Sequence, residues 1–310
     1  IRRPPRSTRK ESSAASDVYK RQVLNIPLDI IFVYGYFGIP PMGGVGCGIA
    51  TSINVVIGVI VLVLVIIKKK EYRPTKIFSK FSLPNWDTTK EALKLGLPIG
   101  FGVFVELSMF SGAALILGSL GATVISGHTV AINIVSVLFI LPLSFGLAAA
   151  TRIGNLVGEK KLHQAKYASN IAIFICFAGA ILNMVIILIF RDNLVSLYSS
   201  DLAVATIAMN LLLFGAIFQI PDGMQMGALG SLRGYKDTFA PMLMIILTYW
   251  FVALPVGYFL TYFGIFGDPM GPSGIWIGMI TGLTIFASLI IPRLNYIASK
   301  FIARSNPELL

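Results

Sequence analysis

Charged residues are scarce in this sequence. Only 13% of its 310 residues are Asp, Glu, Lys or Arg, whereas 55% are hydrophobic. A soluble domain of ordinary composition carries about 25% charged residues, which cover the surface that it presents to water. The shortage therefore excludes an ordinary water-soluble enzyme or binding module, and it favours a chain that lies mostly in lipid.

Cysteine and histidine are rarer still. Cys47 and Cys176 lie in apolar segments at a spacing that fits neither a metal site nor a redox pair, so we expect both to be buried. His128 lies at the edge of an apolar run and His163 in a basic stretch, and we expect both to face water. Because no His-rich or Ser/His arrangement occurs within the apolar runs, nothing favours an intramembrane enzyme, a catalytic residue or a cofactor.

Residues 1–22 differ from the rest of the chain. They hold seven basic residues against Glu11 and Asp17, and they are rich in Ser, Pro and Arg without an apolar stretch. This composition predicts disorder and excludes a signal peptide. The run also resembles translated sequencing-adapter sequence, so we interpret it as a non-native leader, with a basic cytoplasmic tail as the alternative. On that interpretation the native protein resumes near Val23, inside a helix, and the chain is an N-terminally truncated fragment.

The sequence is rich in long apolar runs. The first is too short to cross about 30 Å of hydrocarbon, as expected of a helix that lacks its beginning, and the other seven are long enough to span a membrane. The runs are 23–37, 44–67, 95–118, 123–150, 167–190, 203–231, 239–263 and 273–296. The sequence therefore predicts an all-α polytopic membrane protein.

Basic residues alternate along the connections between these runs. Seventeen Lys and Arg residues lie in one alternate set of connections and only Arg191 lies in the other. Since cytoplasmic loops carry the excess of basic residues, the C-terminus is predicted to be cytoplasmic. No Lys or Arg is predicted inside a span.

The chain also repeats itself at an offset of 228 residues. The matches are Pro27 with Pro255, Tyr34 with Tyr262, Pro41-Met42-Gly43 with Pro269-Met270-Gly271, Gly46 with Gly274, and Ile49 with Ile277. Four spans separate the two copies, so both copies have the same orientation. This pattern indicates a parallel repeat of two helices and their outer turn, which is typical of transporters.

Two acidic residues are predicted near the middle of the membrane. Glu106 lies eleven residues into its span, and Asp222 follows Pro221, whose ring leaves the carbonyl of Ile217 without a backbone donor. A charged group at the bilayer centre costs about 2.5–3.5 kcal/mol even on the most lenient scale, so it usually marks an ion or substrate path. We therefore predict that Glu106 and Asp222 hold a coupling cation, either Na⁺ or H⁺, with no basic residue nearby.

Aromatic, amide and thioether side chains surround Asp222 at helical spacing, and they suit a soft organic cation. The predicted substrate cavity comprises Phe214, Phe218, Gln219, Gln225 and Met226. Asp29 is a weaker candidate for an ion path. The Asn residues within the spans, such as Asn54 and Asn183, are predicted to link helices rather than to bind a ligand.

Three stretches stand out as motifs: NIPLDIIFVYGYFGIPPMGGVGCGIAT, LPLSFGLAAATRIGNLVGEKKLHQAK and SLRGYKDTFAPM. They resemble motifs of the MATE (multidrug and toxic compound extrusion) family, in its NorM-type branch. The resemblance implies twelve helices in two six-helix lobes, with a cation site that uses acids of the seventh and tenth helices, here Glu106 and Asp222. A tyrosine that is common one turn before the second acid is replaced by Phe218.

The resemblance also implies how the chain is divided. Residues 23–67 would end the N-terminal lobe with a partial helix 5 and helix 6, 68–94 would form a cytoplasmic loop, and 95–296 would form the C-terminal lobe of helices 7–12. Residues 297–310 would form a cytoplasmic tail.

These features predict a Na⁺- or H⁺-coupled antiporter that exports organic cations or amphipathic drugs. It would be a monomer in the bacterial cytoplasmic membrane and would bind no nucleic acid. One alternative is a lipid-linked oligosaccharide flippase of the same superfamily, whose pyrophosphate substrate would require basic residues in the cavity. A channel is another alternative, although the repeat and the proline-broken helices favour a moving transporter.

Overall fold

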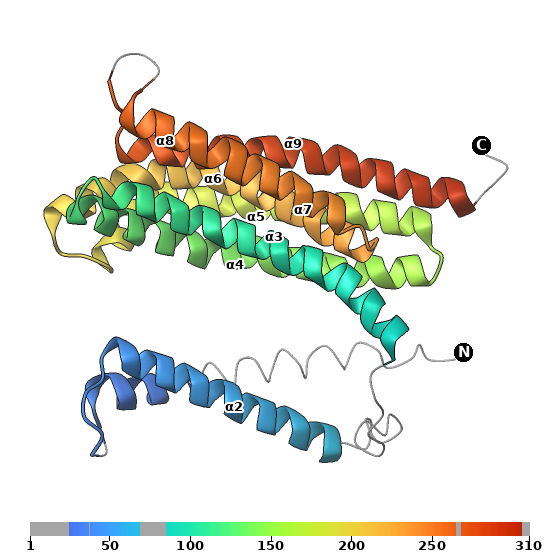
Figure 1. The fold of residues 1–310 in the computed structure, drawn as a ribbon, viewed down its shortest axis with the longest axis horizontal. Helices are drawn as coiled ribbons and strands as arrows, with labels where there is room; N and C mark the ends of the chain where they lie inside the picture. Colours follow the sequence, from blue (N-terminus) through green and yellow to red (C-terminus); the bar gives the residue numbers. More distant parts are fainter. Residues whose placement is uncertain (1–24, 37, 69–84, 265–267, 306–310) are drawn as a thin grey trace. The chain divides into compact units, whose positions relative to one another are not determined.

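The computed structural model describes residues 25–36, 38–68, 85–264 and 268–305. The predicted leader and most of the predicted inter-lobe loop lie outside these residues. The chain divides into two compact units, residues 1–83 and 84–310, which are described separately. All regular elements in the described residues are helices, so the predicted all-α fold is confirmed (Figure 1).

The helices follow the apolar runs. A short helix covers Asn25–Tyr34. The labelled elements are α2 (Gly44–Lys68), α3 (Trp86–Gly118), α4 (Ala122–Gly158), α5 (Leu162–Ser196), α6 (Leu202–Gly234), α7 (Phe239–Ile245), η2 (Ile246–Ala253), α8 (Leu254–Tyr262) and α9 (Pro272–Ser305). With α7, η2 and α8 counted as one span, seven described helices are long and apolar enough to cross a membrane. This is the number of complete spans predicted from the sequence.

Several helices extend beyond the apolar runs. The helix α3 begins at Trp86 rather than at residue 95, and α9 continues to Ser305 rather than ending at residue 296. Hydropathy detects only the stretch that fits the hydrocarbon, whereas the backbone hydrogen bonds of a helix continue into the polar layers as long as no residue ends it. Part of the predicted loop and part of the predicted tail are therefore helical.

The first unit contains the helix Asn25–Tyr34 and α2. The side chain of Asn54 in α2 donates a hydrogen bond to Oδ1 of Asn25 at 3.0 Å, so Asn54 links the two helices as predicted. Asn25 also donates to the carboxylate of Asp29 one turn further along. Cys47 is exposed on α2, so the prediction that it is buried is wrong, whereas Cys176 in the second unit is buried as predicted.

The predicted repeat is confirmed in the local structure of both copies. The helices that end at Tyr34 and Tyr262 lie 228 residues apart, as do the starts of α2 and α9. The turns carry the same bonds: the amide of Met42 donates to the carbonyl of Phe32 at 3.1 Å, and the amide of Met270 to the carbonyl of Leu260 at 3.0 Å. The same backbone path therefore occurs twice.

Glycine is required at one position in each copy. A Cβ at Gly46 would lie 2.4 Å from the carbonyl oxygen of Phe32, and a Cβ at Gly274 would lie 2.5 Å from the amide of Thr261. Only a residue without a side chain lets the second helix approach the backbone of the first so closely. The paired glycines found in the sequence thus mark close helix crossings.

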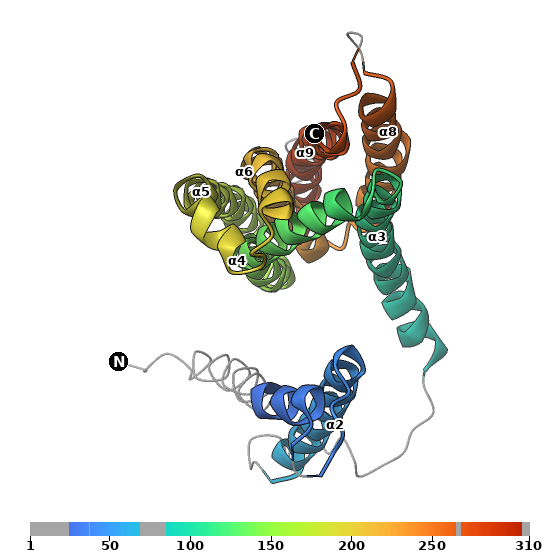
Figure 2. The same ribbon diagram turned by 90° about the vertical axis from the view of Figure 1, so that its left-hand side faces the viewer.

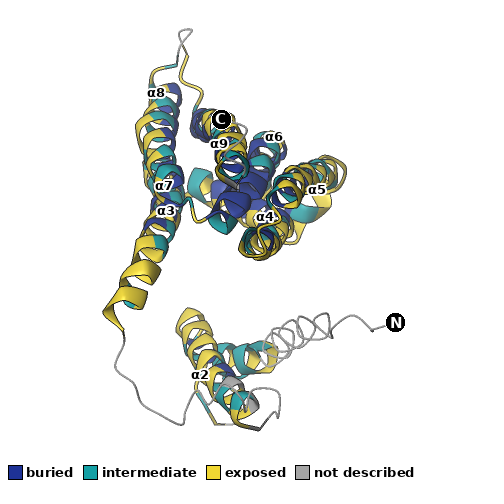
Figure 3. Cartoon of the chain, turned by 90° about the vertical axis from the view of Figure 1, so that its right-hand side faces the viewer, coloured by how far each residue is buried: buried dark blue, intermediate teal, exposed yellow. Residues whose placement is uncertain are grey.

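The second unit is a bundle of six spans with α6 at its centre. The helix α6 packs against α4, α5 and α9, while α3 lies along α7, η2 and α8 (Figures 1 and 2). Buried residues gather around α6, and the outer faces of the bundle are exposed and largely apolar (Figure 3). Trp276, Tyr249 and Phe218 are among the largest side chains that are fully buried. The span of α7, η2 and α8 contains a π-helical segment, which is uncommon and often occurs at functional sites.

Candidate functional site

Asp222 lies in the middle of the central helix. Although Pro221 removes a backbone donor, α6 runs without a break from Leu202 to Gly234. The Asp222 side chain is only 4% exposed, and its Oδ1 accepts a hydrogen bond of 2.7 Å from Nε2 of Gln225, one turn further along. The carboxylate is therefore held in place from its own helix.

Tyr249 extends this hydrogen-bond chain to a second span. The residue lies in the π-helical segment η2 and is 1% exposed. Its hydroxyl donates to Oε1 of Gln225 at 2.7 Å. The amide of Gln225 thus joins the Asp222 carboxylate to the Tyr249 hydroxyl, and we call these three residues the Asp222 network. Tyr249 was not predicted from the sequence, because nothing in the pattern pairs it with a residue 24 positions earlier on another helix.

Glu106 has a different environment on α3. Its side chain is half-buried, and it makes no hydrogen bond or ion pair with any residue in the described ranges. Asp222 on α6 is not among the residues that line the pocket beside Glu106, so a shared cation site for the two acids stays a prediction. Two carboxylates with neighbouring oxygen groups are the kind of ligands that bind Na⁺ or exchange a proton. Within the described residues, no group of three or more His, Cys, Asp or Glu side chains could hold a metal ion.

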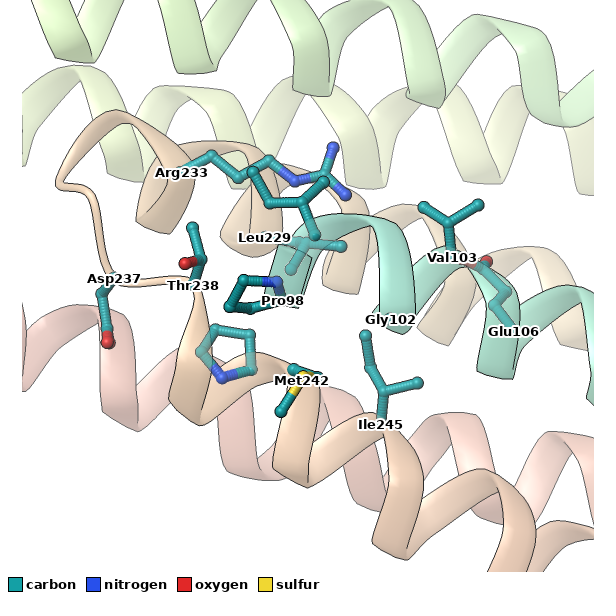
Figure 4. Close-up of a pocket in the computed structure, with 12 residues that line it drawn as sticks. Pro98, Gly102, Val103, Glu106, Leu229, Arg233, Asp237, Thr238, Met242 and Ile245 are labelled. Carbon is teal, nitrogen blue, oxygen red and sulfur yellow. The ribbon is translucent and has the colours of Figure 1, made fainter. Parts of the chain in front are cut away.

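A narrow pocket opens beside Glu106 (Figure 4). Residues of α3, of the last two turns of α6, of the following turn and of α7 line it. Its free volume of about 10 Å³ is room for a single water molecule. The lining residues are Pro98, Ile99, Gly102, Val103, Glu106, Leu229, Arg233, Asp237, Thr238, Pro241, Met242 and Ile245. The pocket can therefore admit water or a small cation, but not an organic substrate.

Arg233 contradicts one prediction. Its position after the apolar run placed it in a loop, with no basic residue near the two acids. In the structure α6 continues to Gly234, so the half-buried Arg233 side chain lines the same pocket as Glu106. Hydropathy could not reveal this, because a long side chain at a helix end reaches back along the helix.

The five residues of the predicted substrate cavity are packed inside the bundle. Phe218, Gln219, Gln225 and Met226 are buried, and Phe214 is half-buried. None of the five lines the pocket at Glu106 or the two larger grooves on the outside of the bundle. Their contact with substrate therefore stays a prediction.

Two members of this group have structural partners. The ring of Phe218 packs edge-on against Trp276, with centroids 6.1 Å apart. The Gln219 amide accepts from Asn183 at 3.2 Å and donates to the carbonyl of Val135 at 3.3 Å. Asn183 thus links helices, as predicted for the membrane asparagines.

His128 is also placed differently from the prediction. It was expected to face water, but it is 2% exposed, and its Nδ1 accepts a hydrogen bond of 3.2 Å from the indole of Trp276. The prediction failed because the sequence gives the depth of a residue along a helix more readily than the face on which it lies. His163, by contrast, is exposed as predicted.

Comparison with known proteins identifies the architecture of this chain. The sequence profile of the MatE family matches residues 98–259, which is more than half of the chain and reaches from α3 to α8. The chain is 39% identical over 275 residues to the multidrug resistance protein NorM of Vibrio vulnificus. It is 38% identical over 280 residues to the multidrug resistance protein PmpM of Pseudomonas aeruginosa. These alignments cover about 90% of the chain and about 60% of each relative.

Solved structures agree with the sequence comparison. The crystal structure of the eukaryotic MATE transporter AtDTX14 matches with a TM-score of 0.81 at 22% identity, covering 93% of this chain and 64% of that one. An outward-facing multidrug resistance MATE transporter of the MOP superfamily matches with a TM-score of 0.76 at 20% identity, covering 91% of this chain and 61% of that one. At these identities the structures establish the fold. Together with the family profile, they show that the chain belongs to the MATE family of multi-pass membrane proteins.

Proposed function

We propose that this chain contributes the cation-binding lobe of a Na⁺- or H⁺-coupled antiporter, which exports organic cations across the bacterial inner membrane by alternating access. The printed names of the relatives from Vibrio vulnificus and Pseudomonas aeruginosa, both multidrug resistance proteins, support export of drugs. The chain spans about 60% of the length of these relatives, so the activity of the whole protein is part of the proposal.

The observation that supports ion coupling is the pair of interior carboxylates. Asp222 is buried and Glu106 is half-buried, and both lie within the same six-span bundle. Two like charges in a region of low dielectric repel each other strongly, so a proton or Na⁺ that neutralises one of them is bound favourably. The Asp222 network supplies neutral oxygen groups beside the charged ones.

Exchange follows from competition for this negative charge. A coupling cation and an organic cation cannot both neutralise the same carboxylates, so the release of one favours the binding of the other. One elementary charge that moves inward through a membrane potential of 100 mV releases about 2.3 kcal/mol. At 1:1 coupling this energy sustains roughly a fiftyfold drug gradient, when charge carried by the drug is neglected.

The structure offers little support for the flippase alternative. A pyrophosphate substrate calls for several basic groups around a wide cavity. Arg233 is the one basic residue that lines the pocket at Glu106, and that pocket holds about one water molecule. We therefore retain the antiporter as the proposed function.

The test is ethidium efflux from vesicles that contain the protein as its complete gene encodes it. Imposed Na⁺ and pH gradients should each be tried, and the one that drives efflux identifies the coupling ion. Glu106→Gln and Asp222→Asn should each reduce gradient-driven efflux at least about tenfold, because each removes a negative charge that the cation neutralises.

A matched control is Glu159→Gln. Glu159 is exposed after α4, and the hydrogen bond from Lys161 holds the pKa of its carboxyl below the usual range, so it too is charged at neutral pH. This variant should leave efflux unchanged. If both interior variants retain coupled efflux, the site assignment is wrong, and if neither gradient drives efflux in the unmodified protein, the antiporter proposal is wrong.

A further inference from the structure

Arg233 has an unusual environment for a basic residue. It lies in the last turn of α6, half-buried, and its Nε is buried without a hydrogen-bond partner among the described residues. Burial of a guanidinium N–H without an acceptor is costly, and a protein usually supplies an acceptor in at least one of its working states.

The neighbouring charges are already paired. Asp237, which lines the same pocket, accepts hydrogen bonds of 2.8 and 3.3 Å from the guanidinium of Arg293. Lys236 forms an ion pair with Glu91 at 2.8 Å, and Asp222 accepts from Gln225. Within the described part of the chain, the pocket thus holds one carboxylate and one guanidinium without a close partner, Glu106 and Arg233.

The pocket connects these two groups. Glu106 comes from α3 and Arg233 from α6, and the Arg233 side chain extends along α6 in the direction of Glu106 (Figure 4). Both groups line this pocket, which has room for about one water molecule. An arginine side chain is long and keeps its charge at all physiological pH values, so it can serve as a tethered cation.

We propose that Arg233 is the internal counter-charge of Glu106, which neutralises this carboxylate in the part of the transport cycle when no coupling cation is bound. The inference rests on the proposed function. A coupling cation at Glu106 then competes with the tethered guanidinium as well as with the drug. This competition weakens cation binding and speeds cation release. When no cation is bound, Arg233 compensates the charge of the Glu106 carboxylate inside the membrane.

Cation binding to the purified protein in detergent, produced from the same complete gene as in the efflux test, tests this proposal without a transport assay. Tryptophan fluorescence is the readout, because Trp276 packs on Phe218, one turn from Asp222, and the Trp250 indole donates to Ser108, two residues from Glu106. The probes are Na⁺, exchanged for choline at constant ionic strength, and H⁺. Arg233→Gln should lower the half-saturating concentration of the bound cation by about tenfold, the effect of one close charge.

Three variants make the result specific. Arg233→Lys keeps the charge and should stay within about threefold of the unmodified chain. Arg152→Gln removes a basic residue that lines a different groove and should change nothing. In a Glu106→Gln background, Arg233→Gln should have no effect, since the carboxylate that it neutralises is absent. If Arg233→Gln does not fold, Arg233→Met, which keeps the aliphatic stem, takes its place.

The two proposals fail in different ways. If Glu106→Gln abolishes the cation response but Arg233→Gln and Arg233→Met leave the half-saturating concentration unchanged, the counter-charge is wrong and the cation site stands. If the unmodified chain responds to neither Na⁺ nor H⁺, or if Glu106→Gln responds normally, the cation site itself is wrong.

Discussion

The two interior carboxylates lie in contrasting surroundings. Asp222 is on the central helix α6, almost fully buried, and linked through Gln225 to Tyr249. Glu106 is on α3 at the side of the bundle, half-buried, and next to a pocket of the size of one water molecule. The two acids are therefore not equivalent. The Asp222 carboxylate is held by a hydrogen bond, whereas the Glu106 carboxylate has no hydrogen-bond partner in the described residues.

The largest expected difference between the surroundings of Asp222 and those of Glu106 lies in how tightly they are packed. A Cβ at Gly223, next to Asp222, would lie 2.6 Å from Cβ of Ala180 and 2.8 Å from the carbonyl of Cys176, whereas one at Gly102 would lie 3.4 Å from Ile245. Gly223→Ala should lower the free energy of unfolding by about 3 kcal/mol through overpacking. Gly102→Ala should change it by less than about 1 kcal/mol. Thermal unfolding of the chain in detergent measures both, and equal losses would remove the contrast.

The hydrogen bond to Asp222 gives the next contrast. Asp222→Asn keeps an acceptor for Gln225, whereas Asp222→Leu leaves a buried amide N–H unpaired. The leucine variant should therefore be less stable than the asparagine variant by about 2 kcal/mol. Glu106→Leu and Glu106→Gln should agree within about 0.5 kcal/mol, because the Glu106 side chain makes no hydrogen bond in the described residues. Denaturant unfolding measures these free energies. A similar difference between the leucine and the amide variant at both positions would contradict the comparison.

Tyr249 gives the smallest contrast. Tyr249→Phe removes the donor to a fully buried oxygen of Gln225 and should cost about 1 kcal/mol. Ser108→Ala removes the acceptor of the Trp250 indole, which lies on a 48% exposed side chain of the span. Since side-chain hydrogen bonds between membrane helices contribute only about 0.6 kcal/mol on average, the loss should stay at about 0.5 kcal/mol. Both values come from the same unfolding assay. A larger loss for Ser108→Ala would show that the α3 side is the more tightly constrained one.

The sequence predicted much of this fold because the membrane imposes simple rules. The length of an apolar run determines a membrane span, and a close helix crossing requires a glycine, so the sequence predicts the seven spans and the repeat. It singles out Asp222 and Glu106 for a similar reason, since a charged residue among apolar ones is conspicuous.

The rest of the site depends on contacts between helices, which leave no local pattern. In the sequence Tyr249 is one more aromatic residue in an apolar run, and only the structure shows that its hydroxyl donates to Gln225 on α6. The sequence pattern assigns Arg233 to a loop, whereas in the structure α6 continues past it. The buried position of His128 likewise depends on Trp276, 148 residues away.

The π-helical segment has a consequence for insertions and deletions. Hydrogen bonds in a π-helix close over one residue more than in an α-helix, so η2 holds surplus chain between α7 and α8. Loss of one residue from Ile246–Ala253 would let this stretch close as an α-helix, whereas the same loss inside α6 would turn everything beyond it by about 100°. In a deletion scan of the bundle, the loss of one residue should change the length and direction of a helical span least when that residue lies in η2.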